Sequence, residues 1–336
     1  MNTTLPRRVL GKTGLSVSVM GLGTCFMAQL GQDGVAACVR HGMERGVNYF
    51  DTAADYGKGG DEILLGQALK AIRNEVILAT KVGYTPDPRD HRSADGIMRQ
   101  FEDSLTRLQT DHVDIIQVHE ADFLKWWTDR PMTAEEGLDH MGALIRDNEA
   151  YDFADAPVVT FLRRAKESGK ARFVGLTAKD ARRTARILEA IDVDTVMTAH
   201  QFNPILRNAQ KFLFPITQQK GIGVVGGAVL MKGWLAVEQN TWRTQRPSWM
   251  DEPFHHAYFR FVEISRENGI PMAELTIRWV LEEERQASLV FGFGSREVID
   301  QNLDAALKGP LPPDLKQAVD AIGLIHPLLY QGRHSL

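Results

Sequence analysis

Short apolar runs recur along the chain, and segments of helical period separate them. The runs have the length and apolar content of buried strands: 20–23, 48–50, 76–80, 114–118, 172–176, 195–199, 223–226 and 288–292. Between them, apolar positions recur every three or four residues in 35–45, 62–72, 97–108, 158–166, 181–190, 211–219 and 297–307. The pattern therefore predicts strands and helices in alternation.

Eight strand–helix units in 336 residues predict an α/β fold, a (β/α)8 TIM barrel. A short β-hairpin is expected before it, with Val9-Leu10 and 16–19 joined by the turn 11–14. No Ser/Pro-rich linker and no change of composition divides the chain. We therefore expect a single barrel domain over 1–336.

A doubly wound sheet is the competing fold, and one glycine motif favours it. Gly221, Gly223 and Gly226 match the G-x-G-x-x-G spacing of dinucleotide-binding folds. That fingerprint must follow a strand and open a helix, whereas this match follows a helix and lies within an apolar strand. We interpret it as a chance match.

Two segments are longer than the repeat requires, 120–155 and 232–253. Loops that follow barrel strands form the C-terminal face, where catalytic sites lie. Indoles that merely cover the outer surface are the structural alternative, but we favour a pocket wall. These loops contain five of the six tryptophans, Trp126, Trp127, Trp234, Trp242 and Trp249.

Composition narrows the class of protein. The apolar fraction is 43%, the charged fraction 24% and the net charge −4, values typical of a globular protein without the basic footprint of nucleic-acid binding. No apolar run is long enough to span a membrane, and 1–14 lacks a signal-like apolar region, so we expect a cytoplasmic protein without membrane partners. Cys25 and Cys38 are too few for a disulfide framework, and the histidines lack metal-ligand spacing, so no metal is expected.

Four ionisable side chains lie at or just beyond the ends of three consecutive predicted strands. Asp51 ends the second strand and Tyr56 follows it, while Lys81 and His119 end the third and fourth. Each has an ordinary structural explanation on its own, such as a capping aspartate or a surface lysine. Because strand ends of a barrel converge on one mouth, we predict that the four lie together.

These residues resemble the motifs of the aldo-keto reductases. The resemblance covers nearly the whole chain, through Gly21-Leu22-Gly23-Thr24, Asp51-Thr52, Tyr56-Gly57, Lys81 and His119. The stretches 93–99 and 225–227 are similar to the branch of D-threo-aldose and pyridoxal dehydrogenases. The resemblance implies reversible, metal-free hydride transfer between a nicotinamide cofactor and a small carbonyl or alcohol substrate. A cofactor-binding accessory subunit of potassium channels, with little turnover, is the alternative.

The four side chains suit proton exchange with a carbonyl oxygen. A free phenol has a pKa of about 10, and a neighbouring ammonium lowers it, so we expect Lys81 to lower the pKa of Tyr56. Asp51 can compensate the buried ammonium. His119 can donate to the carbonyl oxygen and orient the substrate.

The resemblance also implies a cofactor site and a substrate pocket. Thr177-Ala178 replaces the family's Ser-Asn pair, and Gly227 replaces an aromatic residue. NADP(H) is expected to be preferred, with NAD(H) possible, because Arg296 lies at a helix start that favours anions. The expected cofactor contacts are Gly23, Thr24, Asp51, Thr177, Gln201, Gly226, Gly227, Gly292, Gly294, Ser295, Arg296, Gln301 and Asn302. The expected pocket residues are Cys25, Tyr56, Tyr84, His119, Trp126, Trp127 and Trp234, which suit a sugar or polycyclic alcohol.

Overall fold

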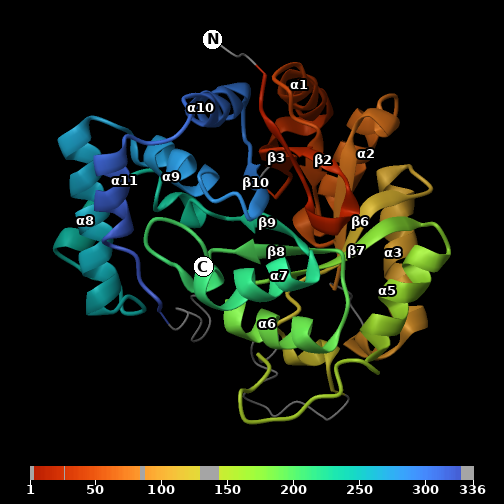
Figure 1. Cartoon of the computed structure of the whole chain (residues 1–336). Coiled ribbons are helices and arrows are strands. Elements are labelled where there is room, and N and C mark those ends of the chain that lie inside the picture. The colour runs from red at the N-terminus through yellow and green to blue at the C-terminus, as the bar shows by residue number, and fades with distance from the viewer. Residues whose placement is uncertain (1–3, 26, 84–87, 129–143, 327–336) are drawn as a thin grey trace.

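Eight parallel strands form a closed barrel in the order β10-β3-β4-β5-β6-β7-β8-β9 (Figure 1). This computed structural model describes residues 4–25, 27–83, 88–128 and 144–326. The predicted (β/α)8 fold is confirmed. The barrel strands are β3 (Met20–Gly23), β4 (Tyr49–Asp51), β5 (Ile77–Val82), β6 (Val113–Val118), β7 (Ala171–Ala178), β8 (Thr195–Ala199), β9 (Gly223–Gly227) and β10 (Gln286–Gly292).

Helices surround the barrel, as Figure 1 shows. The helix at 94–108 illustrates how they form: the Ser93 side chain accepts from Gly96 N, and apolar positions such as Ile97 and Phe101 are buried on one face. The helices are α1 (Gly31–Glu44), α2 (Gly60–Leu69), α3 (Ala94–Leu108), α5 (Pro157–Glu167), α6 (Ala181–Ala190), α7 (Phe214–Lys220), α8 (Glu252–Asn268), α9 (Met272–Leu281), α10 (Arg296–Leu307) and α11 (Pro313–Asp320).

Helices α8, α9 and α11 were not anticipated from the sequence pattern. The long segment after β9 ends where α8 begins, because the Asp251 side chain accepts from Phe254 N at 3.0 Å. An aspartate followed two residues later by a proline is a sequence signal for such a start. Helix α8 buries Phe254, Tyr258 and Phe261 against the core.

The N-terminal hairpin closes the bottom of the barrel. Its strands β1 (Arg7–Val9) and β2 (Ser16–Ser18) pair in antiparallel fashion, which confirms the predicted hairpin. Leu10, Leu15 and Val17 are buried in one cluster with apolar residues of the barrel strands. Lys12 N donates to Gly221 O at 2.7 Å, so the hairpin turn is held against the chain that enters β9.

The glycines of the G-x-G-x-x-G match have structural roles. Gly221 ends α7 with φ 65, a conformation that favours glycine. Gly223 opens β9, and a Cβ there would lie 2.8 Å from the backbone carbonyl carbon of Leu10. The close approach of the hairpin therefore requires a glycine at this position.

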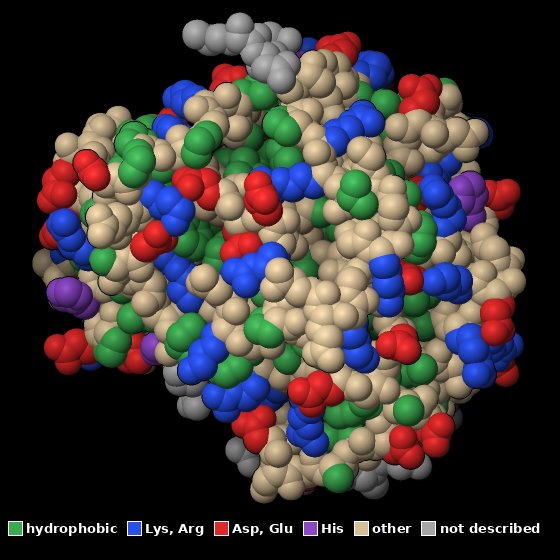
Figure 2. All heavy atoms as spheres, in the orientation of Figure 1, with side chains coloured by type: hydrophobic (Ala, Val, Ile, Leu, Met, Phe, Trp, Pro, Cys, Tyr) green, Lys and Arg blue, Asp and Glu red, His purple; other side chains and the backbone are tan. Residues whose placement is uncertain are grey.

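The surface offers no single-sign patch on the face shown in Figure 2, where acidic and basic side chains are interspersed. Among the described residues, no helix is both long and apolar enough to cross a membrane. In the same part of the chain, no group of three or more His, Cys, Asp and Glu side chains has the arrangement of a metal site.

Candidate active site

The backbone after β4 reverses sharply and places Tyr56 at the barrel mouth. Tyr56 begins the 3-10 segment Tyr56–Gly59, in which Gly57, Lys58 and Gly59 have φ 57, 54 and 86. This left-handed region costs a glycine little, whereas Lys58 is strained there. The reversal leads directly into α2.

A buried carboxylate anchors this reversal from the outer side of the barrel. Glu62, in the first turn of α2, is fully buried. It accepts from Thr80 Oγ1 at 2.6 Å and from Arg107 Nε at 2.7 Å. Since Thr80 belongs to β5 and Arg107 to α3, Glu62 fixes the loop that carries Tyr56 to two neighbouring elements.

Inside the barrel, Asp51 and Lys81 form a buried ion pair with exposed side-chain fractions of 4% and 1%. Lys81 Nζ also donates to Thr52 O at 2.7 Å. The second oxygen of Asp51 accepts from Gln117 Nε2 at 3.0 Å. Each charge is thus compensated and hydrogen-bonded, which a buried ion pair requires.

The structure brings the four predicted residues together. Lys81 Nζ lies 4.9 Å from the ring centroid of Tyr56. The ring of His119 meets the ring of Tyr56 edge to face, with centroids 5.7 Å apart and planes at 80°. The prediction that these side chains lie together is confirmed for Asp51, Tyr56, Lys81 and His119.

The expectation that the Tyr56 phenol has a pKa below its ordinary value is wrong for this structure. Burial raises the pKa of the Tyr56 phenol well above its ordinary value, and the carboxylate of Asp51 raises it further. The charge of Lys81 is already paired with Asp51. The phenol is therefore neutral and a hydrogen-bond donor near neutral pH.

A carboxylate outside the predicted set approaches His119. Asp55 Oδ1 lies 3.2 Å from His119 Nδ1, and their side chains are 24% and 11% exposed. Burial favours a higher pKa for Asp55, but the hydrogen bond and charge of His119, together with Lys81, leave that pKa below its ordinary value. Asp55 is therefore ionised beside the imidazole at neutral pH.

The predicted pocket tryptophans divide into two groups. Trp126 is buried next to the tetrad, and its Nε1 donates to His119 O at 3.2 Å. Trp127 donates to Ala121 O and packs against Phe153. Both line a cavity of about 540 Å³ whose wall includes Lys125 and Tyr151 among the described residues.

The second group comes from the segment before α8 and packs against that helix through Trp242 and Trp249. Trp234 stacks on Trp249 with centroids 4.7 Å apart, and Trp242 meets both rings and Tyr258. These indoles pack on one another and on the core, so the structural alternative describes them better than a pocket wall. Tyr84, also predicted for the pocket, lies outside the described residues.

Cys25 follows β3 at the rim of the mouth. The residue is exposed as a whole, yet desolvation of the thiol raises its pKa to about 11, with smaller effects from Lys81 and Asp51. These charges place the thiol within electrostatic reach of the tetrad. At neutral pH the thiol is protonated.

Residues predicted for the cofactor surround the same mouth. Gly23 pairs with Asp51 on one side and with Gly292 on the other. Thr24 Oγ1 donates to Thr52 Oγ1 at 2.8 Å, which ties the end of β3 to β4. Thr177 accepts from Glu120 N at 3.0 Å, so its hydroxyl is engaged with the segment after β6.

The remaining candidates lie after β8, β9 and β10. Gln201 accepts from Ala181 N at 3.3 Å, while its buried Nε2 has no hydrogen-bond partner among the described residues. A Cβ at Gly227 would lie 3.2 Å from Met197 Sδ, and one at Gly226 would meet the side chain of Gln286. Other members of the set lie from the end of β10 through α10: Gly292, Gly294, the N-cap Ser295, the exposed Arg296 and Gln301, and the buried Asn302.

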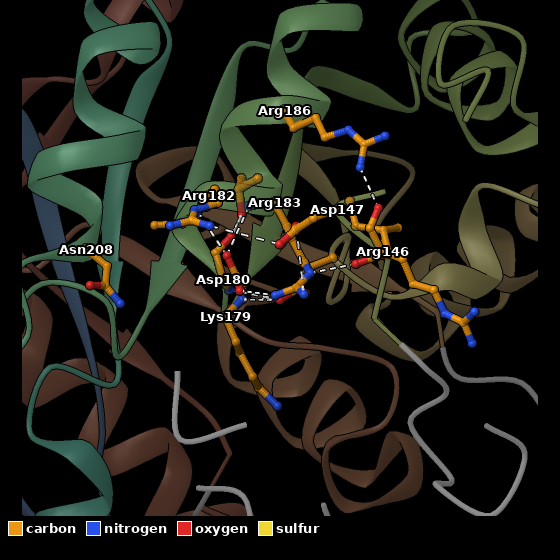
Figure 3. A network of polar contacts seen from close by, with 12 residues as sticks. Arg146, Asp147, Lys179, Asp180, Arg182, Arg183, Arg186 and Asn208 are labelled. Atoms are coloured by element: carbon orange, nitrogen blue, oxygen red, sulfur yellow. Dashed lines mark hydrogen bonds and ion pairs between the residues drawn. The ribbon is translucent and has the colours of Figure 1, made fainter. Parts of the chain in front are cut away.

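A polar network beside the mouth fixes the start of α6 (Figure 3). Asp180 accepts from Arg182 N and Arg183 N, each at 3.0 Å, and so caps the helix. Arg183 Nε donates to Ile145 O at 2.6 Å, and Arg186 donates to Arg146 O at 2.7 Å. The network thus joins α6 to the segment that precedes α5.

Sequence reasoning missed Gln117 and Asp55. Gln117 lies two residues before His119 on β6, and strand alternation places both on the inner side. Period-two counting from His119 could have found it. Asp55 carries no such signal, because it lies in an irregular turn after β4.

The comparisons with known proteins identify the family. The family model described as "Aldo/keto reductase family" matches residues 19–323. The chain belongs to the aldo/keto reductase family. Membership supports NAD(P)-dependent oxidoreductase activity, and it confirms the resemblance drawn from the motifs.

Two relatives are dehydrogenases of the kinds that the sequence suggested. L-galactose dehydrogenase of Arabidopsis thaliana is 27% identical over 315 residues, covering 90% of this chain and 88% of the relative. Pyridoxal 4-dehydrogenase of Microbacterium luteolum is 27% identical over 331 residues, covering 88% and 92%. The holo form of the aldo-keto reductase AKR11C1 from Bacillus halodurans matches with a TM-score of 0.70 at 24% identity, covering 97% of this chain and 100% of its own. That structural likeness confirms the fold.

Proposed function

We propose that this protein catalyses reversible hydride transfer between a nicotinamide cofactor and a small carbonyl or alcohol, with Tyr56 as the group that exchanges the proton. The observation that carries this proposal is the position of the Tyr56 ring. It lies over the buried Lys81–Asp51 pair and against His119. The four side chains thus meet around one point at the mouth.

The chemistry of the proposed step follows from the protonation of Tyr56. Reduction of a carbonyl develops an alkoxide, which needs a proton. Since burial keeps the phenol neutral, Tyr56 can donate that proton, and Lys81 stabilises the negative charge left on the ring oxygen. His119 donates to the carbonyl oxygen and orients it.

The residues at the mouth fit a nicotinamide dinucleotide. The buried Gln201 Nε2 donates no hydrogen bond to any described residue, so it suits the carboxamide oxygen of a nicotinamide. The start of α10 offers backbone N–H groups and the guanidinium of Arg296 to a phosphate. In the proposal, Thr177 and Gln201 hold the nicotinamide end, and Ser295, Arg296 and Asn302 hold the adenosine end. When bound, the cofactor supplies or accepts the hydride.

NADP(H) is the proposed preference over NAD(H). Arg296 is exposed next to the N-cap Ser295 and has the reach for bidentate contact with a phosphate. Burial raises the pKa of the Cys38 thiol on α1 and the charge of Arg296 acts to lower it, so the guanidinium lies within electrostatic reach of that helix. This position suits a 2′-phosphate at the edge of the barrel.

For the substrate we propose a ring-bearing alcohol or aldehyde. Trp126 holds the backbone of His119, and the cavity that Trp126 lines has none of the four tetrad residues among the described residues of its wall. An indole beside polar groups is typical of sites for sugars and cyclic alcohols. The names of the two dehydrogenase relatives support the same class.

The test is the absorbance of the reduced nicotinamide band, followed with a panel of aldehydes, sugars and cyclic alcohols. Tyr56→Phe should lower turnover about 10²–10⁴-fold, the usual contribution of general acid–base catalysis. Cofactor affinity should change little, because only the transition state uses the hydroxyl. Turnover of the variant within a few-fold of wild type would contradict the role of Tyr56.

A cofactor-binding accessory protein is the alternative that the same experiment separates. Such a protein would bind the dinucleotide but turn over every substrate of the panel slowly. Dinucleotide binding without turnover would therefore favour this alternative over the proposed enzyme.

A further inference from the structure

A half-buried carboxylate lies beside His119, at the ring nitrogen opposite to Nε2. Asp55 Oδ1 is 3.2 Å from Nδ1, and both side chains are largely buried. Asp55 immediately precedes Tyr56, whose ring packs edge to face on the same imidazole. The three side chains thus form a continuous row.

The backbone on both sides holds this arrangement. His119 N donates to Val82 O at 2.9 Å, and His119 O accepts from Trp126 Nε1 at 3.2 Å. On the other side, Tyr56 N donates to Ala53 O at 3.2 Å within the turn that presents Asp55. The approach of the two side chains therefore follows from the fold.

We propose that Asp55 is a positioning residue for the proposed hydride transfer: it accepts a hydrogen bond from His119 Nδ1, so that Nε2 donates to the substrate oxygen only when the ring is an imidazolium. The inference rests on the proposed function. It adds a residue that neither the motifs nor the four-residue site contains.

The tautomer of His119 decides which ring nitrogen can donate a hydrogen bond. A neutral imidazole has one N–H, and a carboxylate at Nδ1 favours the proton on that nitrogen. Nε2 of the neutral ring is then an acceptor and cannot donate to a carbonyl oxygen. Only the protonated ring has both N–H groups, and it binds a developing oxyanion more strongly than a neutral donor does.

This arrangement complements Tyr56. The Tyr56 phenol stays protonated near neutral pH, so it does not titrate in the range where the enzyme would work. The Asp55–His119 pair supplies the group whose protonation matters in the proposal, because Nε2 can donate only when Nδ1 and Nε2 both carry protons. Reduction should accordingly be lost as the pH rises and the imidazolium gives up its proton.

Other charges also act on the pair and must be considered in its pH dependence. These groups carry both signs. Asp55 is the charge nearest to the His119 ring, but the others also influence the protonation of the ring. The charged groups are Asp51 from β4, Lys81 from β5, Asp61 from α2, and Glu120 and Lys125 after β6; the titratable groups that stay neutral are Tyr56 from the turn after β4 and Cys25 after β3.

Two substitutions separate the charge of Asp55 from its hydrogen bond. Asp55→Asn keeps an acceptor but removes the charge, so the high-pH loss of carbonyl reduction should move about one pH unit lower, as expected for loss of an adjacent opposite charge. Asp55→Leu removes the acceptor as well, so the neutral Nε2–H tautomer becomes available. Its rate should be lower at the optimum but should depend less on pH. The readout is kcat and kcat/KM against pH with saturating cofactor.

The matched control is Asp95→Asn, which removes one charge from an exposed pair between Asp95 on α3 and Arg164 on α5. Its profile should superimpose on that of wild type. If all three variants keep the wild-type profile and differ only in amplitude, Asp55 is structural and the proposal is overturned.

A measurement on the unaltered protein keeps the two proposals distinguishable. ¹⁵N NMR of the imidazole in the full chain, with cofactor bound, should show Nδ1 protonated in the neutral ring. A neutral ring protonated on Nε2 would overturn the role of Asp55 whatever the turnover. Absence of turnover in wild type would instead defeat the proposed function.

Discussion

The two ends of the barrel are built from the same strands but solve different problems. At the bottom, Leu10, Leu15 and Val17 of the hairpin pack into the apolar residues that enter the barrel. At the mouth, Asp51 and Lys81 are buried with almost no exposure. The bottom thus contributes stability, whereas the mouth holds charges that cost stability and are retained for chemistry.

The change of character occurs within single strands. Along the inner side of β4 the side chains are Tyr49 and then Asp51, and along β5 they are Ile77, Ala79 and then Lys81. Strand alternation alone places these residues on one side. The change from apolar to ionic side chains along each strand therefore shows, from the sequence alone, which end of the barrel is the catalytic face.

Among the substitutions that test this difference between the two ends, Asp51→Ala should have the largest effect on stability and turnover. It leaves the ammonium of Lys81 buried without compensation and should cost about 3–5 kcal/mol of unfolding free energy, along with turnover. Urea unfolding measures the first, and the cofactor absorbance assay the second.

The matched double variant Asp51→Ala/Lys81→Met removes both charges. It should regain much of the stability but none of the activity, since a buried pair replaced by apolar groups is often neutral. Equal stability of the single and double variants would mean that Lys81 finds other compensation at the mouth.

The corresponding change at the bottom is Leu10→Ala. Leu10 is fully buried in the hairpin cluster, so the variant should lose about 2–5 kcal/mol of unfolding free energy. Turnover of the folded protein should stay at the wild-type value. The neighbouring Val9→Ala is the control, because Val9 is 63% exposed and its truncation should change stability little. A fall in turnover with Leu10→Ala would show that the two ends are coupled.

Sequence patterns predicted the barrel and the tetrad because both depend on strand period. The strand ends placed Asp51, Lys81 and His119 on one mouth without any knowledge of packing. The partners of these residues were harder to foresee. Asp55 reaches His119 through an irregular turn with left-handed residues, whose path no periodicity describes.

The tryptophan prediction shows a further limit. Trp126 and Trp234 lie in loops of similar length and composition, yet only Trp126 contacts the tetrad. Trp234 packs on Trp242 and Trp249, whose rings meet Tyr258 and Phe254 of α8, and the sequence pattern did not predict that helix. The path of a loop depends on the helices and strands that pack on it. Residue type alone therefore could not show that Trp126 lies at the tetrad and Trp234 does not.

A smaller effect is expected at the rim of the mouth, from Arg296→Ala. Loss of a charge-assisted bond should weaken NADPH binding by about 1–3 kcal/mol and leave NADH binding nearly unchanged. Titration by intrinsic fluorescence quenching compares the two cofactors. Arg163→Ala, an exposed cation on α5, is the control for the change in net charge. Equal losses for both cofactors would show that Arg296 does not contact the 2′-phosphate.

The most direct measure of what the mouth costs in stability concerns Asp61 at the start of α2. Its side chain is almost fully buried, and Oδ1 has no hydrogen-bond partner among the described residues. Burial, and then the charge of Asp55, raises its pKa from 3.8 to about 6. The folded state therefore binds a proton more tightly than the unfolded chain does, and wild-type stability falls as pH rises from 3.8 to about 6.

Asp61→Asn removes the ionisation and should unfold at a higher temperature than wild type at pH 8. The difference should shrink as the pH falls and disappear below the unfolded pKa, where the wild-type carboxyl is neutral in both states. Thermal unfolding over a pH series measures it, with Asp95→Asn as the control because Asp95 is exposed. A gain that is the same at pH 4 and pH 8 would mean that shape or hydrogen bonding, rather than the buried charge, limits stability at the mouth.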